Sequence, residues 1–564
     1  MSTGTNTVGA LESDSPHQSP ALRMSELQTA FGSTGFELAD AHELVCIAQK
    51  LQKSEQLVEW LARNHGSTGI GVLSILNALL NLTQYKMGQQ CVDDAIGSNR
   101  LYSDYIFHFA DFLVSQNQYV KACYLLEWLA PYREGDKALY LIWSKVAYRI
   151  GDHKLYRRVC SLATSQLRDA AEFELSEIRA RIYEPEIEQK TIHAASCSWA
   201  SRSFENVPRT ALKARSESSR PRVGLLGDYI HPMFIGPLLA VYDSAKVEVE
   251  LITNDARASQ VYSGQIHALD IQNPKRAVEM LRSLELDVLI EMTGRYEELR
   301  LMAERPARIQ GSWIATNLTQ GPLLSDFVLA DPILIPKRDR HEWSEKIIDM
   351  PVWAPFQFYS QTPEIGDCPS DTNGCVTFGA CQRAMKFNDP LLSLWAELLS
   401  EVSNSRLVLK DQSFVDPFVR ESMLQRCFRA GINLEKVCLE EGTPHPAYYD
   451  YYNAIDISLD TYPYGGGILT AESLWMGVPV VTLAGDRFNS RLAASYLTAL
   501  GREEWMTDNP RDYISTAKSL AENHAVRLAF RQSARDEMLK SPIMDYPQFA
   551  RAWEKSILEL LDGS

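Results

Sequence analysis

The chain has 564 residues, several times the usual domain size, which predicts more than one domain with a core of its own. Its net charge of −16 and pI of about 5.3 disfavour a general electrostatic hold on nucleic acid or anionic lipid. The ten cysteines form no CxxC pair and no Cys/His cluster at metal-binding spacing, so neither a disulfide framework nor a zinc site is expected.

The N-terminal stretch "MSTGTNTVGALESDSPHQSP" has neither a cationic start nor the apolar core of a signal peptide. No apolar run in the chain is long enough to span a bilayer. We therefore expect a cytoplasmic protein without membrane insertion. Residues 1–30 are polar and are predicted to be disordered.

Residues 31–187 have a helical pattern with an internal repeat. The segments "VLSILNALLNLTQYKMGQQCVDDA", "YIFHFADFLVSQNQYVKACYLLEWL" and "LYLIWSKVAYRIGDHKLYRRVCSLA" each contain an apolar helix, a polar turn and a second apolar helix. Tyr85, Tyr119 and His153 occupy the same turn position, 34 residues apart. This period predicts a tetratricopeptide-like all-α solenoid with an extended binding surface; an irregular helical bundle is the alternative.

The region after the repeats changes in character. Helices near 39–65 and 168–183 would cap the stack. Residues 188–221 are rich in serine and arginine and lack sustained periodicity, so we predict a linker there.

Beyond the linker, short apolar strands alternate with helical spacers, which predicts parallel sheets covered on both faces. We expect two doubly wound lobes, residues 222–365 and 366–545, and a terminal helix at 546–564, with ligands bound at the carboxyl ends of the strands. The predicted strands are "RVGLLGD", "VEVELIT", "DVLIEMTG", "IQGSWIA" and "DFVLAD" in the first lobe, and "CVTFGAC", "SRLVLKD", "KVCLEEG", "IDISLD" and "VPVVTLAG" in the second.

A glycine loop follows the strand "IDISLD". In "TYPYGGG", Gly465, Gly466 and Gly467 would let backbone N–H groups approach an anion closely, and the helix "ILTAESLWMG" would add the favourable partial charge of its N-terminus. The loop therefore indicates a phosphate site. A plain tight turn is the alternative.

The loop, the carboxylate after it, "LWMGVPVVTLAG" and the following Ser-Arg pair resemble the catalytic region of the O-GlcNAc transferase and SPINDLY family, glycosyltransferase family forty-one. The resemblance covers about residues 222–560, and many members also carry a tetratricopeptide array. It implies a GT-B fold of two Rossmann-like lobes in a bacterial member of the family. The other matching stretches are "ERPARIQGSW", "WSEKIIDMP", "FGACQRAMKFNDP", "SRLVLKDQSF" and "EEGTPHPAYYDYYNAIDISLD".

The resemblance implies roles for individual residues. Lys386 matches the lysine that holds the donor diphosphate and stabilises the leaving group. His231 and His267 match cleft histidines that would orient substrate or accept a proton, and Glu472 matches a carboxylate that would bind the ribose. A surface lysine, structural histidines and a helix-capping carboxylate are the alternatives. The remaining donor-cleft candidates are Gly465, Gly466, Gly467, Thr470, Lys410, Arg383, Arg487 and Arg491.

The chain departs from the family pattern after the glycine loop. Where relatives carry His-Thr-Thr or a run of threonines, it has Gly467, Ile468 and Leu469, and Thr470 is the only hydroxyl left. Ile and Leu side chains cannot donate to a diphosphate. The resemblance therefore leaves the donor open between a UDP-GlcNAc-like sugar and a CMP-linked nonulosonic acid of the pseudaminic type.

The predicted function is protein O-glycosylation. A Ser or Thr hydroxyl of a protein acceptor bound by the repeats would attack the anomeric carbon, while Lys386 and the amides of Gly466 and Gly467 hold the leaving nucleotide. Family precedent implies inversion without a metal or other cofactor. Deleting residues 1–190 is expected to impair acceptor modification far more than nucleotide binding. The alternatives are a flagellin O-glycosyltransferase using the CMP-linked donor and a non-catalytic protein-binding module.

Overall fold

The computed structural model divides into two compact units, Met1–Val146 and Ala147–Ser564, and each is described by itself. His231 lies outside the described residues, and of the helix predicted near 39–65 only residues 44 and 47 are described, both helical. The structure describes residues 19–30, 44, 47, 69–81, 83–208, 220–229, 232–314, 318–358, 361–444 and 446–563.

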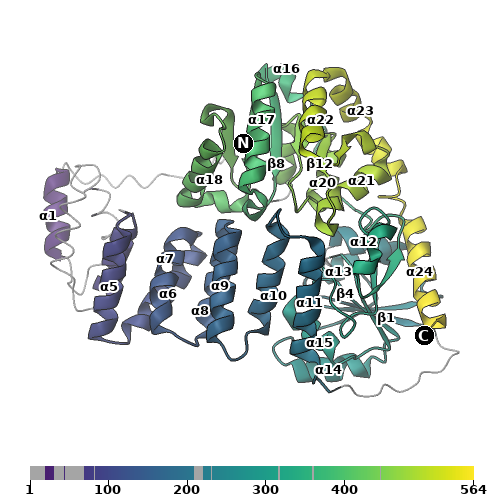
Figure 1. Cartoon of the computed structure of the whole chain (residues 1–564), viewed down its shortest axis with the longest axis horizontal. Coiled ribbons are helices and arrows are strands. Elements are labelled where there is room, and N and C mark those ends of the chain that lie inside the picture. Colours follow the sequence, from purple (N-terminus) through teal and green to yellow (C-terminus); the bar gives the residue numbers. More distant parts are fainter. Residues whose placement is uncertain are drawn as a thin grey trace, which may run out of the picture. The chain divides into compact units, whose positions relative to one another are not determined.

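Helix pairs with the predicted period build the first unit (Figure 1). The second helices of successive pairs begin at Tyr85, Tyr119 and, in the second unit, His153, as the 34-residue repeat predicts. Leu76, Ile106 and Leu126 are fully buried, because each pair covers its apolar face with its neighbours. The elements are α4 (Gly69–Asn81), α5 (Tyr85–Ser98), α6 (Tyr102–Ser115), α7 (Tyr119–Leu129), η1 (Ala130–Tyr132) and α8 (Lys137–Ile150), whose last residues belong to the second unit.

The prediction that residues 1–30 are disordered is wrong for residues 20–30. They form helix α1 (Pro20–Ala30), which begins with proline at its first position and buries Met24 and Leu27. The i, i+3 spacing of these two residues gives the short helix one apolar edge. Residues 1–18 lie outside the described residues.

The second unit begins with helices that continue the repeat pattern: α9 (His153–Gln166), α10 (Ala171–Ala180), η2 (Arg181–Tyr183) and α11 (Gln189–Phe204). Helix α11 occupies the first half of the predicted linker, which is a correction. Its Ile192, Trp199 and Phe204 are buried in a core shared with Leu299 and Leu318 of the following lobe. The many Ser and Ala residues between these apolar residues make the helical periodicity weak, which is why the sequence predicted a linker here.

The N-terminal lobe contains a seven-stranded parallel sheet in the order β3-β2-β1-β4-β5-β6-β7. Strands β3 and β7 were not predicted, because β3 is short and largely exposed at one edge and β7 lies at the other edge with one buried residue. The strands are β1 (Arg222–Leu226), β2 (Glu248–Ile252), β3 (Gln265–His267), β4 (Val288–Glu291), β5 (Ile309–Ser312), β6 (Phe327–Ala330) and β7 (Lys346–Asp349); the helices are α12 (Pro232–Val241), α13 (Ala258–Val261), α14 (Pro274–Ser283), α15 (Tyr296–Ala303) and η3 (Lys337–Glu342).

The C-terminal lobe contains a six-stranded parallel sheet in the order β10-β9-β8-β11-β12-β13. The strands are β8 (Val376–Cys381), β9 (Ser405–Lys410), β10 (Val437–Glu440), β11 (Ile457–Leu459), β12 (Val480–Leu483) and β13 (Met506–Thr507). The helices are α16 (Pro369–Asn373), η4 (Ala384–Lys386), α17 (Asp389–Glu401), η5 (Gln412–Val415), α18 (Pro417–Arg429), η6 (Leu434–Lys436), η7 (Ala447–Tyr449), α19 (Asp450–Asn453), α20 (Ile468–Trp475), η8 (Phe488–Arg491), α21 (Leu492–Leu500), η9 (Glu503–Trp505), α22 (Pro510–Glu522), α23 (His524–Lys540) and α24 (Tyr546–Asp562).

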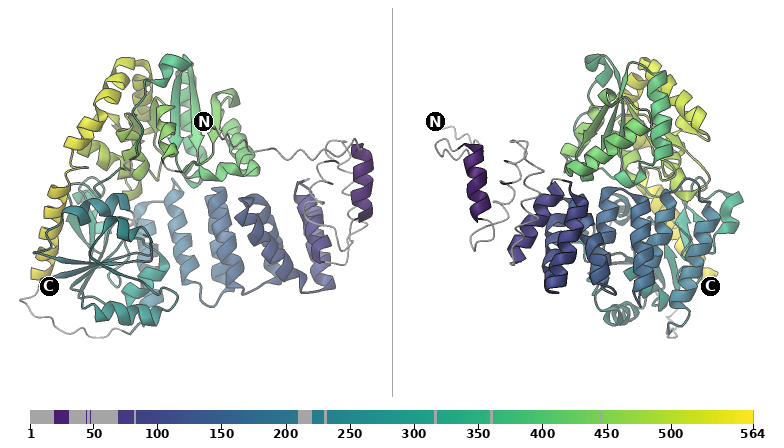
Figure 2. Two further views of the ribbon diagram at one scale, coloured as in Figure 1. Left: turned by 180° about the vertical axis from the view of Figure 1, so that it is seen from behind. Right: turned by 60° about the vertical axis from the view of Figure 1, so that its left-hand side comes forward.

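Both sheets have the strand order of a doubly wound nucleotide-binding fold, and helices flank each of them (Figure 2). All ten predicted strands are present, and the predicted two-lobed fold with a helical solenoid is confirmed. Helix α24 returns to the first lobe, where Glu554 Oε1 accepts the N–H of Asp243 at 2.8 Å. The carboxyl ends of β8 and β11 therefore place the glycine loop at the ligand-binding edge of the C-terminal sheet.

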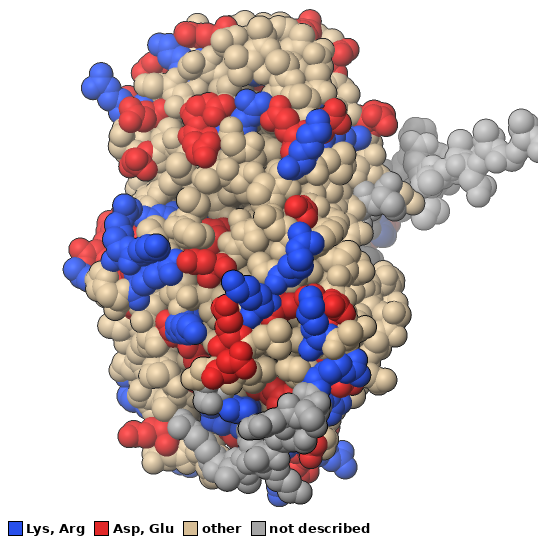
Figure 3. Space-filling model, turned by 90° about the vertical axis from the view of Figure 1, so that its right-hand side faces the viewer, with Lys and Arg blue, Asp and Glu red and all other residues tan. Residues whose placement is uncertain are grey.

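Acidic and basic side chains are interspersed on the face of the molecule shown in Figure 3. Among the described residues, no helix is both long and apolar enough to cross a membrane.

Candidate functional site

The structure brings Lys386 and the glycine loop together. Lys386 ends the short helix η4 after β8 and is 7% exposed. Its Nζ donates to the carbonyl oxygen of Gly465 at 2.7 Å and to Oε1 of Gln382 at 3.0 Å, and lies 4.1 Å from the ring centroid of Tyr464. Two segments predicted separately to bind a donor phosphate thus form one site.

Burial and, to a smaller extent, the nearby Arg383 guanidinium lower the pKa of Lys386 to about 7, against the opposing effect of the Asp460 carboxylate. The side chain is therefore only partly protonated at neutral pH. Because an anion close to Nζ favours the charged form, binding of a phosphate would raise this pKa and take up a proton.

Asp460, at the carboxyl end of β11, is the central residue that the sequence analysis missed. Its buried carboxylate accepts the N–H of Gly466 at 2.7 Å and the hydroxyl of Thr482 at 2.7 Å. Burial raises its pKa, while these hydrogen bonds and Lys386 act in the opposite direction. The Gly466 amide, predicted to contact the leaving nucleotide, is instead engaged by this carboxylate. An acidic residue that ends a buried strand was the available signal.

Close packing explains two of the loop glycines. A Cβ at Gly465 would lie 2.6 Å from Oδ2 of Asp460, and one at Gly466 would lie 2.7 Å from Nε2 of Gln382. Alanine at either position would therefore require the Asp460 carboxylate or the Gln382 amide to move. Gly467 is the N-cap residue of α20, and no side-chain cap is present there.

Thr470 and Glu472 both lie on α20, directly after the loop. The Thr470 hydroxyl donates to the carbonyl of Gly466 at 2.8 Å and so supports the loop. Glu472 is 1% exposed and accepts a hydrogen bond from the Tyr452 hydroxyl at 3.3 Å. Burial raises the pKa of Glu472 to about 8, so at neutral pH it is largely protonated and able to donate a hydrogen bond.

Comparisons with known proteins agree with this geometry. Residues 369–553 match the model of the family described as Glycosyl transferase family 41. These residues contain Lys386, Asp460 and the whole glycine loop.

The chain carries a glycosyltransferase family 41 domain.

Relatives and a solved structure extend the match. The chain is 33% identical over 321 residues to the probable UDP-N-acetylglucosamine–peptide N-acetylglucosaminyltransferase SPINDLY of Eustoma exaltatum, which covers 55% of this chain and 34% of that protein. It is 33% identical over 291 residues to SPINDLY of Arabidopsis thaliana, covering 50% and 31%. It thus spans about a third of these relatives' length. An O-GlcNAc transferase mutant of Thermobaculum terrenum shares the fold, with a TM-score of 0.75, 21% identity and coverage of 97% and 99%.

Three other predicted donor-site cations of the family 41 domain are already paired. Lys410 Nζ lies 3.3 Å from Oε2 of Glu440. Arg491 Nη1 lies 2.9 Å from Oδ2 of Asp339, and so joins the two lobes. Arg383 donates to the hydroxyl of Tyr148. Their predicted roles toward a donor remain predictions.

Arg487 and His267 form hydrogen bonds with residues outside the glycine loop and away from Lys386. Arg487 is buried next to the loop after β12 and donates through Nη2 to the carbonyl of Pro185 at 2.8 Å. His267 ends the edge strand β3, where its Nε2 lies 2.7 Å from Oε2 of Glu250. Among the described residues, no hydrogen bond or ion pair joins His267 to the other predicted site residues. The structure thus groups it with the sheet of the first lobe.

Helices of the repeat type form one wall beside Lys386 and the glycine loop. Tyr148 contacts Arg383, and a Cβ at Gly151 would lie 2.5 Å from the Cβ of Ala384. The ring of Tyr183 lies 5.4 Å from the ring of Tyr464, which in turn covers Lys386. Met385 and Tyr464 belong to the same apolar core as α10 and α11. The sequence did not predict this wall, because a repeat motif carries no information about what packs against its last helix.

Proposed function

We propose that the chain is a protein O-glycosyltransferase that transfers a sugar from a nucleotide sugar to a Ser or Thr hydroxyl of a protein acceptor. The family 41 domain and relatives named as peptide N-acetylglucosaminyltransferases support this proposal. The single observation that carries it is the buried Lys386, held by the glycine loop at the ligand-binding edge of the sheet.

The site suits departure of a nucleotide. As the acceptor oxygen bonds to the anomeric carbon, the bond from that carbon to the phosphate oxygen breaks and negative charge grows on the phosphate. Protonated Lys386 stabilises this charge, and the amides of the α20 N-terminus face the same end of the sheet. We propose inversion at the anomeric carbon and a transfer that uses protein charge in place of a metal ion. The acceptor proton leaves to a base that the described residues do not identify.

The donor is proposed to be a UDP-GlcNAc-like sugar. The Thr470 hydroxyl is engaged by Gly466, and Ile468 and Leu469 bring no polar side-chain atoms to the start of α20. Phosphate contacts therefore fall to Lys386 and backbone amides, which do not distinguish one nucleotide base from another. A CMP-linked sugar is the competing donor, with flagellin as the acceptor that the family resemblance suggests.

Calorimetric titration of the full chain with UDP, GDP and CMP tests the proposal. We expect UDP to bind most tightly and Lys386→Ala to lower transfer from UDP-GlcNAc by about 100- to 1,000-fold, as loss of one charge-stabilising donor does. Arg429→Ala, an exposed cation on α18, is the matched control. Preference for CMP would move the proposal to the CMP-linked donor, and binding of none of the three would contradict it.

The helical repeats are proposed to bind the acceptor. A groove of about 520 Å³ in the first unit offers both charge signs and an aromatic ring to a polypeptide. It is lined by Ile96, Arg100, Ser103, Asp104, Pro131, Tyr132, Arg133, Glu134 and Asp136.

A further inference from the structure

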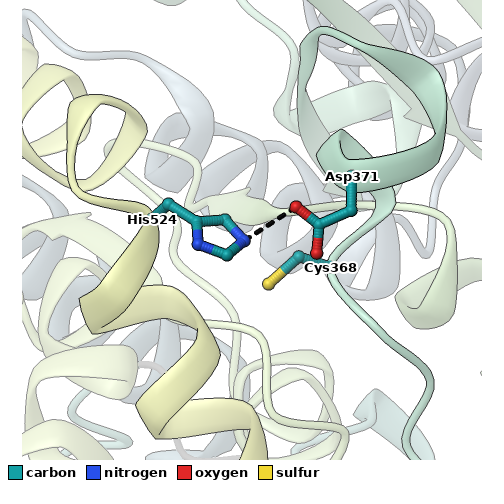
Figure 4. A group of neighbouring side chains, drawn as sticks. All are labelled: Cys368, Asp371 and His524. Carbon is teal, nitrogen blue, oxygen red and sulfur yellow. Dashed lines mark ion pairs between the residues drawn. The ribbon is translucent and has the colours of Figure 1, made fainter.

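Cys368, Asp371 and His524 bring a thiol, a carboxylate and an imidazole together in the C-terminal lobe (Figure 4). One potential ligand atom from each lies within 4.8 Å of the others, and Nε2 of His524 lies 2.8 Å from Oδ1 of Asp371. In the part of the chain that the structure describes, no other three His, Cys, Asp or Glu side chains meet this spacing. We propose that these residues bind a zinc ion.

The elements that carry the ligands are well suited to a metal site. Cys368 is the N-cap residue of α16 and is 1% exposed, so its thiol is fixed by packing. The side chains of Asp371 and His524 are 46% and 45% exposed, and reach the thiol from the surface. Bond lengths of about 2.0–2.3 Å place tetrahedral zinc ligands roughly 3.3–3.7 Å apart. Rotation of the two exposed side chains toward the thiol would close the set, at the cost of their mutual ion pair.

The donor set selects zinc over the common oxygen-binding ions. Mg²⁺ and Ca²⁺ prefer all-oxygen sites, whereas thiolate and imidazole ligands suit zinc. A Cys thiolate and an Asp carboxylate would balance its two charges, and water would complete the tetrahedron.

Two guanidinium groups also face the site, so a metal ion can bind there only if its ligands neutralise its charge. Arg531 hydrogen-bonds to the Cys368 thiol, and the charge of Arg527 acts on the same group. Both would repel a bare cation. Once two anionic ligands have neutralised the metal, a guanidinium that donates to the thiolate stabilises that ligand, as outer hydrogen-bond partners of metal sites do.

The proposed site is distinct from the donor site. Cys368 precedes the amino end of β8, whereas Lys386 follows its carboxyl end, so a strand of about 20 Å separates them. From α23, Arg531 and Arg535 also donate to the carbonyls of Gly366 and Pro363, just before Cys368. The ion would therefore fasten α16 and this connecting segment to α23, and it would have no part in sugar transfer.

Cobalt titration of the metal-free full chain under reducing conditions tests the proposal. We expect one equivalent of Co²⁺ to give a thiolate-to-metal charge-transfer band with tetrahedral visible bands, and Zn²⁺ to displace it and raise the melting temperature. Cys368→Ser should abolish the charge-transfer band, and His524→Ala should weaken binding by more than about 100-fold. Cys438→Ser and His341→Ala, which change an exposed cysteine and an exposed histidine, are the matched controls.

Absence of a cobalt–thiolate band in the unmodified chain would overturn the proposal, as would a band that survives in Cys368→Ser. Circular dichroism establishes whether the Cys368 variant folds. If it does not, His524→Ala decides, because that exposed side chain can be removed without disturbing the core; unchanged cobalt binding by this variant would refute the site.

Discussion

The helices of the first unit and helices α9–α11 of the second share one repeat pattern but differ in what they support. In the first unit, buried residues such as Ile106 and Leu126 belong to helices that pack on helices. In the second, Ile178, Tyr183 and Trp199 share a core with the N-terminal lobe and with Met385 beside Lys386. A repeat motif therefore identifies helices, while the boundary of a compact unit depends on what the last helices touch.

The largest expected effect comes from comparing two N-terminal deletions, one that removes helices α9 and α10 and one that keeps them. Deleting residues 1–190 removes Leu175, Ile178, Ile182 and Tyr183 from the shared core, a loss of roughly 6–12 kcal/mol of burial free energy, comparable to the stability of a whole domain. We expect this variant to unfold and to lose nucleotide binding, contrary to the expectation from the sequence. Deleting residues 1–136 retains α8–α11 and should keep nucleotide affinity within about twofold. Titration calorimetry and thermal unfolding of both variants measure the difference.

Folded, nucleotide-binding protein after deletion of residues 1–190 would break the comparison. If deletion of residues 1–136 abolished nucleotide binding without changing thermal unfolding, nucleotide binding would depend on the first unit as well.

Two glycines with left-handed backbone sharpen the comparison at single residues. Gly135 and Gly151 have φ of +76° and +81°, so alanine is strained at both, by about 1 kcal/mol. Nothing lies within 4 Å of a Cβ at Gly135, whereas one at Gly151 would meet Ala384 Cβ at 2.5 Å and its carbonyl carbon at 2.8 Å. We expect Gly151→Ala to displace the loop carrying Lys386 and to weaken nucleotide binding about tenfold or more, and Gly135→Ala to lower the melting temperature alone. Equal nucleotide affinities for the two variants would contradict the wall.

The sequence predicted the fold well because the fold depends on local patterns. Ten strands, the 34-residue period and the pairing of Lys386 with the glycine loop all followed from apolar runs, spacing or a family resemblance. Asp460, Tyr148 and Tyr183 were not foreseen, because their roles arise from tertiary contacts. Cys368 and His524 illustrate the same limit, since they lie far apart in the sequence and form no short motif such as CxxC.

The pH dependence of nucleotide affinity tests whether Tyr183 excludes water from Lys386 and so helps to lower its pKa. Because burial lowers the pKa of Lys386 to about 7 and a phosphate binds its protonated form, affinity should be constant below pH 7 and fall about tenfold per pH unit above it. Tyr183→Ala should admit water beside Tyr464, raise the lysine pKa toward its usual 10.5 and move this fall to higher pH. Tyr183→Phe keeps the ring and should keep the profile.

Tyr119→Ala, in the first unit, should lower the melting temperature and leave the pH profile unmoved, because Tyr119 is buried among repeat helices. An identical profile for Tyr183→Ala and the unmodified chain would show that the lysine pKa does not depend on the helical wall. Arg383 and Asp460, the charged groups acting on Lys386, are unchanged in all of these variants.

The smallest effect is expected at His267, which the family resemblance implied to be a cleft histidine. The structure instead pairs it with Glu250, whose fully buried carboxylate also forms an ion pair with Arg222. His267→Ala removes one hydrogen bond while Arg222 keeps the carboxylate compensated, so we expect about 1 kcal/mol lower stability and nucleotide affinity within twofold of the unmodified chain. Urea unfolding and UDP titration measure the two quantities, with His267→Gln as the variant that retains a side-chain donor. A tenfold loss of affinity in His267→Ala, with His267→Gln unaffected, would return this residue to the donor cleft and place the first lobe's edge strand in contact with the nucleotide.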